Sequence, residues 1–334
     1  MHVPDGFISL PASLSAAAVA AGGVGVSLRR IRATMRERVV PLAGLAAAFI
    51  FVLQMLNFPV AAGTSGHLLG GALAAILLGP WVGAIVVTVV ILVQGLVFAD
   101  GGVSALGLNV INMALVTALV GWGAFRLATL LMPKTATSMV SATALASWLS
   151  VVAASVAFAG EYAIGGAGGV PATTVLGAMV GVHALIGVGE GIISGLIVSA
   201  VLASRPDLVY GARAAGYRGV ARARVSRAAV GGFVLAGVAV AVVLLALVAP
   251  LASSAPDGLE RVASDHQVAE MGAASAISGS PVAEYDVAGI DDPRIATILA
   301  GTLGLGLTFA VGAALMRATS RGARESARAE RGGS

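Results

Sequence analysis

Long apolar stretches with almost no charge recur along this chain of 334 residues, and they restrict its fold more than any other feature. A helix needs roughly 20 mostly apolar residues to cross a membrane, because the hydrocarbon core is about 30 Å thick. The third stretch is short and ends at Gly79-Pro80-Trp81, so we expect a half-length or tilted helix there. Lipid offers no hydrogen bonds to the backbone, so an all-α polytopic membrane protein is predicted. The nine predicted spans cover residues 8–28, 40–58, 67–79, 82–98, 105–131, 139–160, 174–203, 228–249 and 295–316.

The composition excludes several other classes of protein. Only 11% of the residues are charged, against about 25% in an ordinary soluble domain. The absence of Cys excludes disulfides, Cys-based zinc sites, iron–sulfur clusters and thiol catalysis. The formal charge of +4 comes from arginines between apolar stretches, without an aromatic-studded basic face, which argues against nucleic acid as a partner. No G-x-x-x-x-G-K-[ST] motif occurs, so we expect this chain to bind no nucleotide. Since no nucleophile–base pair or carboxylate cluster can be assembled, we do not expect an enzyme.

The positions of the basic residues predict which way the spans run. Loops on the cytoplasmic side of a membrane carry an excess of Lys and Arg. With the N-terminus outside, 18 of the 20 basic residues fall on the cytoplasmic side, and only Arg261 and Arg294 fall outside. The C-terminus is then cytoplasmic, and most acidic residues are external. The cytoplasmic set is Arg29, Arg30, Arg32, Arg36, Arg38, Arg126, Lys134, Arg205, Arg213, Arg218, Arg222, Arg224, Arg227, Arg317, Arg321, Arg324, Arg328 and Arg331.

The chain divides into two membrane parts at a basic segment. Residues 1–204 hold seven spans, which form a helix bundle, and residues 205–227 form a basic cytoplasmic linker. Residues 228–317 form a two-helix unit around an external loop, residues 250–294, and residues 318–334 form a basic cytoplasmic tail. The external loop is rich in Pro, Ser, Asp and Glu and lacks long apolar periodicity, so we expect it to be small and partly ordered.

The first residues of the chain can chelate a metal. The amine of Met1, the backbone nitrogen of His2 and the imidazole Nδ1 of His2 can close five- and six-membered rings around one ion. These three nitrogens are nearly coplanar because the peptide unit is planar, and such coordination favours nickel(II) or copper(II), with cobalt(II) a plausible neighbour. The chelate needs Met1 to remain, which bulky His2 favours, and an uncleaved first span. The segment Met1–Phe7 has no Lys or Arg, whereas a secretory signal begins with positive charge, so we expect the span to be retained. The alternative is that His2 is a solvated terminal residue.

A second histidine follows a glycine-rich external segment. His67 lies in Gly63-Thr64-Ser65-Gly66-His67, at the outer end of the loop between the second and third spans. By itself it is more typical of a helix start than of a ligand. With His2 on the same side of the membrane, it is a candidate for a fourth metal-ligating nitrogen.

The seventh span carries two ionisable residues and several glycines. His183 and Glu190 are seven residues apart and therefore lie on one helix face. A buried Glu is costly in a membrane and should face a partner inside the bundle. The pair is either a hydrogen-bonding pair that fixes helix packing or a support for a metal site, and a proton-coupled pathway is a third alternative. We interpret Gly-x-x-x-Gly pairs such as Gly177 with Gly181 and Gly187 with Gly191 as helix contacts.

Further polar residues have simple default interpretations. Asn57, Asn109 and Asn112 lie at or near outer span ends, where hydrogen bonds between helices are their default role. Asp257 and Glu260, in Pro256-Asp257-Gly258-Leu259-Glu260, either hold a cation briefly or form a turn and helix start.

Three segments together resemble one family. Met1–Phe7, Gly63–His67 and His183–Glu190 are similar to the CbiM/NikM family, the metal-specific substrate-binding (S) components of energy-coupling-factor (ECF) transporters for cobalt or nickel. The resemblance covers residues 1 to about 204. Residues 228–317, with the sequence PDGLE at 256–260, look like the small N component of these transporters, fused behind the first part. One departure is Val3, where many relatives have Ile.

The resemblance implies a site and a role for its surroundings. It implies a square-planar site of four nitrogens: the Met1 amine, the His2 backbone nitrogen, the His2 ring and the His67 ring. The external loop of the family is thought to assist metal loading, which makes Asp257 and Glu260 candidates for that step. The candidates for support of the ligands are Asn57, Ser65, His183 and Glu190.

The resemblance also implies partners outside this chain. Nickel or cobalt would be the transported substrate, and energy would come from a membrane-embedded T component and cytoplasmic ATPases in a bacterial or archaeal cell (inner) membrane. Ala43 and Ala47, on the second span, are candidates for a sliding contact with the T component. One alternative is a self-sufficient secondary transporter that uses His183 and Glu190. Another is a membrane sensor or assembly protein without transport activity.

Overall fold

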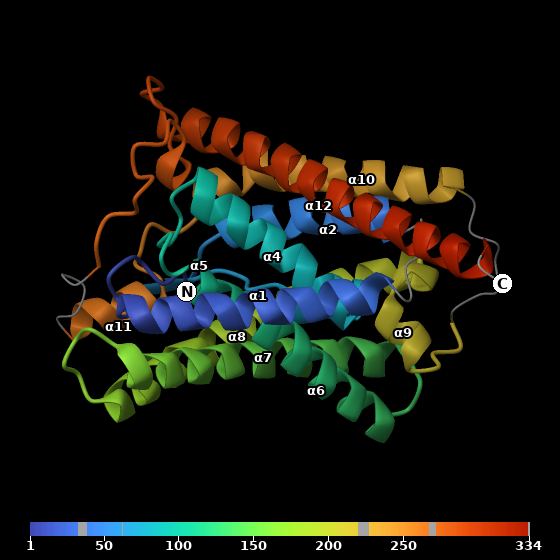
Figure 1. Cartoon of the computed structure of the whole chain (residues 1–334), viewed down its shortest axis with the longest axis horizontal. Helices are drawn as coiled ribbons and strands as arrows, with labels where there is room; N and C mark the ends of the chain where they lie inside the picture. The colour runs from blue at the N-terminus through green and yellow to red at the C-terminus, as the bar shows by residue number, and fades with distance from the viewer. Residues whose placement is uncertain (33–38, 62, 220–226, 267–271, 333–334) are drawn as a thin grey trace.

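The described residues form a bundle of long helices with one small β-hairpin. The computed structural model describes residues 1–32, 39–61, 63–219, 227–266 and 272–332. Arg36, Arg38, Arg222 and Arg224, which we expect to be cytoplasmic, lie outside the described residues. The elements are α1 (Leu10–Arg32), α2 (Val39–Met55), β1 (Phe58–Ala61), β2 (Thr64–Gly66), α3 (Gly71–Leu78), α4 (Pro80–Val97), α5 (Leu106–Asn109), the π-helical turn η1 (Val110–Val116), α6 (Thr117–Leu131), α7 (Ala136–Gly165), α8 (Ala172–Ser204), η2 (Pro206–Leu208), α9 (Tyr210–Ala214), α10 (Arg227–Leu247), η3 (Ala249–Leu251), α11 (Gly258–Asp265), η5 (Ala283–Tyr285) and α12 (Pro293–Gly332) (Figure 1).

Seven helices of the described chain are long and apolar enough to cross a membrane. They are α1, α4, the continuous run Leu106–Leu131, α7, α8, α10 and α12. The second predicted span is the shorter apolar helix α2, with 17 residues. The third is α3, whose 8 residues rise only about 12 Å at 1.5 Å per residue, as its shortness in the sequence predicted. The expectation of an all-α polytopic membrane protein is therefore confirmed.

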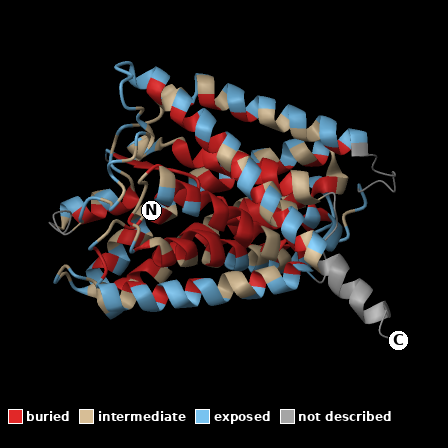
Figure 2. Ribbon diagram, turned by 45° about the horizontal axis from the view of Figure 1, so that its top comes forward, coloured by how far each residue is buried: buried red, intermediate tan, exposed pale blue. Residues whose placement is uncertain are grey.

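The long helices lie side by side in layers around a buried centre. Helices α10, α12 and α2 lie along one side of the bundle, and α6, α7 and α8 along the other, with α1 and α4 between them (Figure 1). Buried residues gather in the middle, and exposed residues follow the outward faces of the outer helices (Figure 2). Many of these exposed residues are Leu, Val or Ile, as expected of helix faces that contact lipid.

The small-residue face of α2 is covered by the last helix of the same chain. Ala43 and Ala47 are fully buried, and a Cβ atom on Gly312 of α12 would lie 3.2 Å from the Cβ of Ala47. Likewise, a Cβ on Gly44 would lie 3.0 Å from the backbone oxygen of Phe309. The expectation that Ala43 and Ala47 contact a T component is wrong for this arrangement, because α12 already occupies their face.

Glycines allow α7 and α8 to approach closely, but only in one half of α8. A Cβ on Gly187 would lie 3.0 Å from the Trp148 side chain, and one on Gly191 would lie 2.8 Å from the backbone oxygen of Ala144. The interpretation of this pair as a helix contact is confirmed. A Cβ on Gly177 or Gly181 would meet no described atom within 4 Å, so the interpretation as a helix contact is wrong for this pair.

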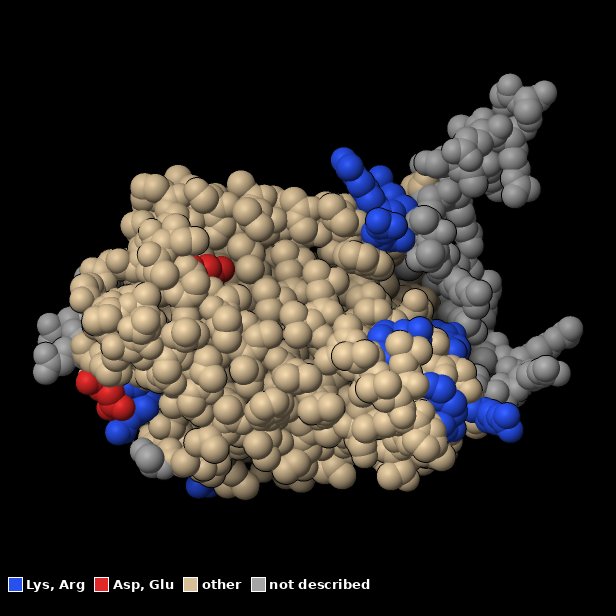
Figure 3. Space-filling view, turned by 90° about the horizontal axis from the view of Figure 1, so that it is seen from below, with Lys and Arg blue, Asp and Glu red and all other residues tan. Residues whose placement is uncertain are grey.

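The two ends of the bundle differ in charge. On the face in Figure 3, most Lys and Arg side chains gather at the right-hand end, and the acidic side chains lie in the other half. The surface between them has almost no charge. The end with few basic residues is the one that holds the N-terminus and α11 (Figure 1).

The described part of the loop 250–294, which we expect to be external, packs onto the bundle. Helix α11 contacts α8 and β2, and its residues Leu259 and Val262 are buried. Further along, the backbone N–H of Ala273 donates to the oxygen of Asp5 at 2.7 Å, and that of Glu284 donates to the oxygen of Phe98 at 2.6 Å. The loop therefore covers the end of the bundle where the N-terminal segment enters.

Candidate metal centre

The N-terminal segment is inserted into the bundle. Met1 and Val3 are buried, and the N–H of Val3 donates to Oδ1 of Asn109 at 2.8 Å. The oxygen of Val3 accepts from the side chain of Asn109 and from the N–H of Gly102. Asn109 is the last residue of α5, where the π-helical turn begins. Its expected hydrogen bonds between helices are replaced by bonds to the N-terminal backbone.

Met1, His2 and His67, which the sequence analysis singled out, lie together at this end. The amine nitrogen of Met1 lies 2.8 Å from Nε2 of His67. The ring centroids of His2 and His67 are 5.3 Å apart. Nδ1 of His2 is buried and has no hydrogen-bond partner among the described residues; a carboxylate oxygen of Asp100 lies 3.7 Å from it. Three nitrogen-bearing groups thus converge on one point.

Asp257 supplies the negative charge at this point. Its Oδ2 accepts a short hydrogen bond from the Met1 amine and lies 3.9 Å from Nε2 of His67. Burial by itself raises the pKa of Asp257, but the amine and His67 outweigh it, so the pKa lies well below the usual range. Burial lowers the pKa of His67 well below its ordinary value, helped by the charge of the amine, and burial also lowers the pKa of His2. Both imidazoles are therefore neutral at pH 7, which is the state that binds metals.

Asp257 and Glu260 also start a helix, as one of their two interpretations predicted. Oδ1 of Asp257 accepts from the N–H groups of Leu259 and Glu260, and Oε2 of Glu260 accepts from the N–H of Asp257 at 2.8 Å. This reciprocal pair is a capping box, which stabilises the first turn of α11. Asp257 therefore uses one oxygen for the helix and the other for the amine.

A glycine lets the loop before α5 approach His2. Gly101 has φ of 90°, a conformation that other residues rarely adopt. A Cβ there would lie 3.0 Å from Nδ2 of Asn109 and 3.2 Å from Cβ of His2. The sequence Asp100-Gly101-Gly102 is typical of a turn, but it does not predict a contact with His2.

Ser65 and Asn57 hold the external loop rather than a metal ligand directly. The N–H of Ser65 donates to the oxygen of Pro256 at 2.8 Å, and its Oγ donates to the oxygen of Ala255 at 2.7 Å. The backbone oxygen of Asn57 accepts from the N–H of Ser253 at 2.8 Å. The hairpin of β1 and β2 thus carries the residues that precede Asp257.

Glu190 and His183 are both buried, but they hydrogen-bond different partners. The carboxylate of Glu190 accepts from the N–H of Leu69 at 2.6 Å and from that of Gly70 at 3.0 Å. These residues follow His67 in the segment without secondary structure before α3, where no helix satisfies their backbone N–H groups. Nδ1 of His183 lies 2.8 Å from the oxygen of Met179. Glu190 therefore holds the segment that carries His67. In the described chain, His183 and Glu190 hydrogen-bond different groups and not each other, so they do not form the hydrogen-bonding pair that was one of the predicted alternatives.

His183 lies behind the cluster. With Met1, His67 and Asp257 it lines a cavity of about 10 Å³, which is too small for another amino-acid residue. Within the described chain, no group of three or more His, Cys, Asp or Glu side chains is arranged to hold a metal ion. A metal at this point would need nitrogens of the chain terminus besides the side chains.

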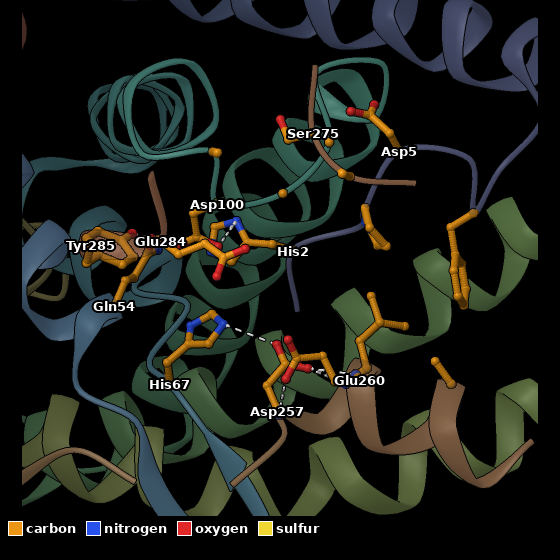
Figure 4. Close-up of a pocket in the computed structure, with 18 of the residues that line it drawn as sticks. His2, Asp5, Gln54, His67, Asp100, Asp257, Glu260, Ser275, Glu284 and Tyr285 are labelled. Carbon is orange, nitrogen blue, oxygen red and sulfur yellow. Dashed lines mark hydrogen bonds and ion pairs between the residues drawn. The ribbon is translucent and has the colours of Figure 1, made fainter. Parts of the chain in front are cut away.

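A larger cavity of about 550 Å³ opens on the other side of His2 and His67. Figure 4 shows both rings pointing into it, with Asp257 and Glu260 on one wall and Asp100, Glu284 and Tyr285 on another. The residues labelled in that view come from the N-terminus, from α2, from two inter-helix segments and from the external loop. We name this cavity the outer vestibule.

Comparisons with known proteins identify the family. Residues 2–208 match the family model CbiM, described as "Cobalt uptake substrate-specific transmembrane region", and residues 231–321 match the PDGLE domain. A putative fused nickel transport protein NikMN of Archaeoglobus fulgidus is 35% identical over 325 residues, which are 95% of this chain and 98% of that protein. A cobalt transport protein CbiM of Geobacter sulfurreducens is 32% identical over 63% of this chain and 61% of its own length.

A solved structure supports the same assignment. A truncated transition metal transporter with 30% identity superimposes with a TM-score of 0.54, over 61% of this chain and 99% of its own. The proteins named here are transport proteins and not enzymes. The helices of spanning length agree with a multi-pass membrane protein. The chain therefore belongs to the CbiM/NikM family of metal-transport membrane proteins, with a PDGLE domain fused behind the CbiM region.

Proposed function

We propose that this chain is the substrate-specific membrane component of an ECF importer for Ni²⁺ or Co²⁺. Four nitrogens would hold the ion in a plane: the Met1 amine, the deprotonated backbone nitrogen of His2, Nδ1 of His2 and Nε2 of His67. The observation that carries the proposal is the 2.8 Å approach of the Met1 amine to Nε2 of His67, beside a buried Nδ1 of His2 that has no hydrogen-bond partner among the described residues. Planar nitrogen coordination suits nickel(II), and low-spin cobalt(II) adopts it as well.

The charge of the cluster supports the proposal. Without metal, the ammonium of Met1 contributes +1 and Asp257 contributes −1. With a divalent ion bound, the amine is neutral and the amide nitrogen of His2 contributes −1, so the metal centre again carries +1. Asp257 therefore balances the site in both states, and no uncompensated charge is buried when the ion enters or leaves.

Energy would come from partner subunits. The chain has no phosphate-binding motif of its own, so a T component and cytoplasmic ATPases would drive the import cycle. The distribution of basic residues supports a membrane orientation with the N-terminus outside and the C-terminus in the cytoplasm. In that orientation, residues 1–204 are the substrate-binding part, and residues 205–227 and 318–334 are cytoplasmic. The proposed metal site and the loop 250–294 would then face the outside, and Asp257 and Glu260 would contact the ion during loading.

Metal titration of the purified chain tests the nitrogen site. We would tag only the C-terminus and titrate with nickel, cobalt, copper and zinc. One nickel or cobalt per chain is expected in the parent and in the control His266→Ala, whose side chain follows α11 outside the cluster. His2→Ala and His67→Ala should lose it. Absence of stoichiometric metal in the parent, or its retention in both histidine variants, would contradict the site.

Uptake into vesicles tests the energy source. Vesicles with this chain together with T and ATPase subunits should accumulate the metal only when ATP is present. Uptake by this chain alone, driven by an ion gradient, would instead favour a secondary transporter that uses His183 and Glu190.

A further inference from the structure

We propose that the outer vestibule is a second cation site, which holds a hydrated divalent ion through oxygen atoms before the ion reaches the nitrogens. This inference rests on the proposed function only for the destination of the ion. Five carboxylates line the vestibule, and no Lys or Arg side chain lines it among the described residues. The carboxylates belong to Asp5, Asp100, Asp257, Glu260 and Glu284.

The carboxylates differ in how far they are already used. Asp5 accepts from the N–H groups of Val103 and Ser104 and from the Ser104 hydroxyl, so its role is to hold the neighbouring loop. Asp257 is shared between the Met1 amine and the start of α11. In contrast, Glu284 is exposed, and its carboxylate has no hydrogen bond or ion pair within the described chain, although the residue borders the vestibule. Glu284 is therefore the residue with most capacity to bind something else.

Asp100 and Glu260 retain part of their capacity. Oδ2 of Asp100 accepts from the hydroxyl of Tyr285 at 2.6 Å, which leaves Oδ1 facing the His2 ring. Glu260 uses Oε2 for the capping box. Burial raises the pKa of Glu260, and the negative charges of Asp257 and Asp100 raise it further. These carboxylates thus repel one another, and a divalent cation between them would relieve the repulsion.

A neutral side chain points independently to a ligand. Gln54 is 4% exposed and lines the vestibule. Its Nε2 donates to the oxygen of Leu69, and its Oε1 has no hydrogen-bond partner among the described residues. A buried acceptor without a donor is costly. A water molecule of a hydrated ion would supply that donor. Asn57 also lines the vestibule, and its buried Oδ1 likewise has no hydrogen-bond partner among the described residues.

The size of the vestibule fits a hydrated ion rather than a bare one. Six waters take up about 180 Å³ at about 30 Å³ each, well within the roughly 550 Å³ available. No three acidic or His side chains of the described chain converge closely enough to coordinate a bare ion. Contacts through water are therefore expected, which favours weak binding and fast release.

The ion in the vestibule lies next to its destination. The rings of His2 and His67 both border the vestibule, so an ion there exchanges waters for nitrogens without crossing another barrier of side chains. The two proposed sites thus differ in chemistry: oxygen atoms capture any divalent ion, and nitrogen atoms select nickel or cobalt.

The first experiment measures the oxygen site without the nitrogen site. We would use Mn²⁺, a hard ion detected by electron paramagnetic resonance, in the His67→Ala background. One weakly bound Mn²⁺ per chain is expected. Glu284→Gln should weaken it about three- to tenfold, and Glu284→Asp should largely restore it. The control Asp291→Asn removes the same charge from an exposed position of the same loop outside the vestibule and should have no effect. No Mn²⁺ binding, or equal weakening by Glu284→Gln and Asp291→Asn, would overturn the proposal.

The second experiment follows nickel entering the full chain. Glu284→Gln should lower the association rate constant about three- to tenfold at low salt, with a smaller effect at high salt and an unchanged dissociation rate. A change in dissociation alone would overturn the proposal, because Glu284 would then belong to the final site. If nickel binding does not depend on His67, the nitrogen site fails, while the Mn²⁺ result still decides the vestibule.

Discussion

The amine nitrogen of Met1 and Nε2 of His67 are 2.8 Å apart, although 66 positions separate the two residues in the chain. The amine reaches this place because Val3 is fixed to Asn109 and Gly102. His67 reaches it because its segment is held by Glu190. Each of these supports gives a test of the proposed site.

Extension of the N-terminus should abolish nickel binding. Four residues placed before Met1 convert the amine into an amide and do not fit the cavity of about 10 Å³ beside it. A single added residue is a poorer test, because a free amine two residues before His2 forms a different nitrogen chelate. Isothermal titration with nickel measures the effect, and the same four residues at the C-terminus are the control. Equal affinity of the two extended proteins would refute the role of the amine.

Asp257→Asn should weaken nickel binding about tenfold, equivalent to about 1.4 kcal/mol. Asn is as good as Asp at the start of a helix, so α11 should remain folded while the charge opposite the amine is lost. Asp265→Asn, which removes an exposed carboxylate paired with Arg261, is the matched control. Titration of both proteins decides the matter, and an unchanged affinity in Asp257→Asn would remove the charge-balance argument.

Glu190→Gln should lower both the stability of the bundle and the affinity for nickel. Glutamine keeps one acceptor but turns an NH₂ group toward a backbone N–H of Leu69 or Gly70, at a cost of about 1.5–3 kcal/mol for the lost charged hydrogen bond. Thermal unfolding in detergent and nickel titration measure the two effects. Glu161→Gln is the control, because among the described residues Glu161 accepts only from the side chain of Asn112. If the control lowers nickel affinity as much, Glu190 has no special part in positioning His67.

Gly101→Ala should disturb His2. The backbone strain is about 1–3 kcal/mol, and the new Cβ would crowd Asn109 and His2. Gly169→Ala is a fair comparison, since Gly169 also has a positive φ but nothing within 4 Å of a Cβ. Both variants should lose stability in thermal unfolding, but only Gly101→Ala should lose nickel affinity. Equal nickel affinities would mean that the close approach is not needed.

Nickel binding should release two protons from the protein at neutral pH, and its pH dependence should show no more than two. Binding releases two protons, one from the Met1 terminus and one from the His2 amide, so the affinity should fall by up to about a hundredfold for each unit by which the pH is lowered. Burial lowers the pKa values of His2 and His67 below that of a free imidazole, so the two rings should add protons to the slope only at lower pH than free imidazoles do. Titrations between pH 5 and pH 8 measure the slope, and a slope of three or four protons at pH 7 and above would contradict the lowered pKa values of the buried imidazoles.

Much of the fold could be predicted from the sequence. The length and lack of charge of each apolar stretch are local properties, and the membrane allows only helices for them, so the long spans and the short third helix were predictable. The capping box at Asp257 and Glu260 is local as well, because its partners are three residues apart. The contact of Ala43 and Ala47 was predicted wrongly, because small residues indicate a close helix neighbour without identifying it.

The candidate site was predictable only in part. The coordinating chemistry of Met1 and His2 follows from their adjacency. His67 became a candidate ligand because it was predicted on the same side of the membrane, and the family resemblance then implied its place in the four-nitrogen site. Nothing in the sequence indicated that Asn109 binds the backbone of Val3, or that Glu190 binds the backbone after His67 rather than His183. Gln54 and Glu284 also carried no sequence signal for the vestibule.

The sequence by itself therefore determined the helices, their apolar outer faces and the chelating start of the chain, since each depends on residues close together along the backbone. Only the tertiary structure decided that Met1, His67, Glu190 and Asp257 meet at one end of the bundle. The physical reason is that such meetings depend on how helices pack and on which buried backbone groups still need a partner. Those conditions exist only once distant segments have come together.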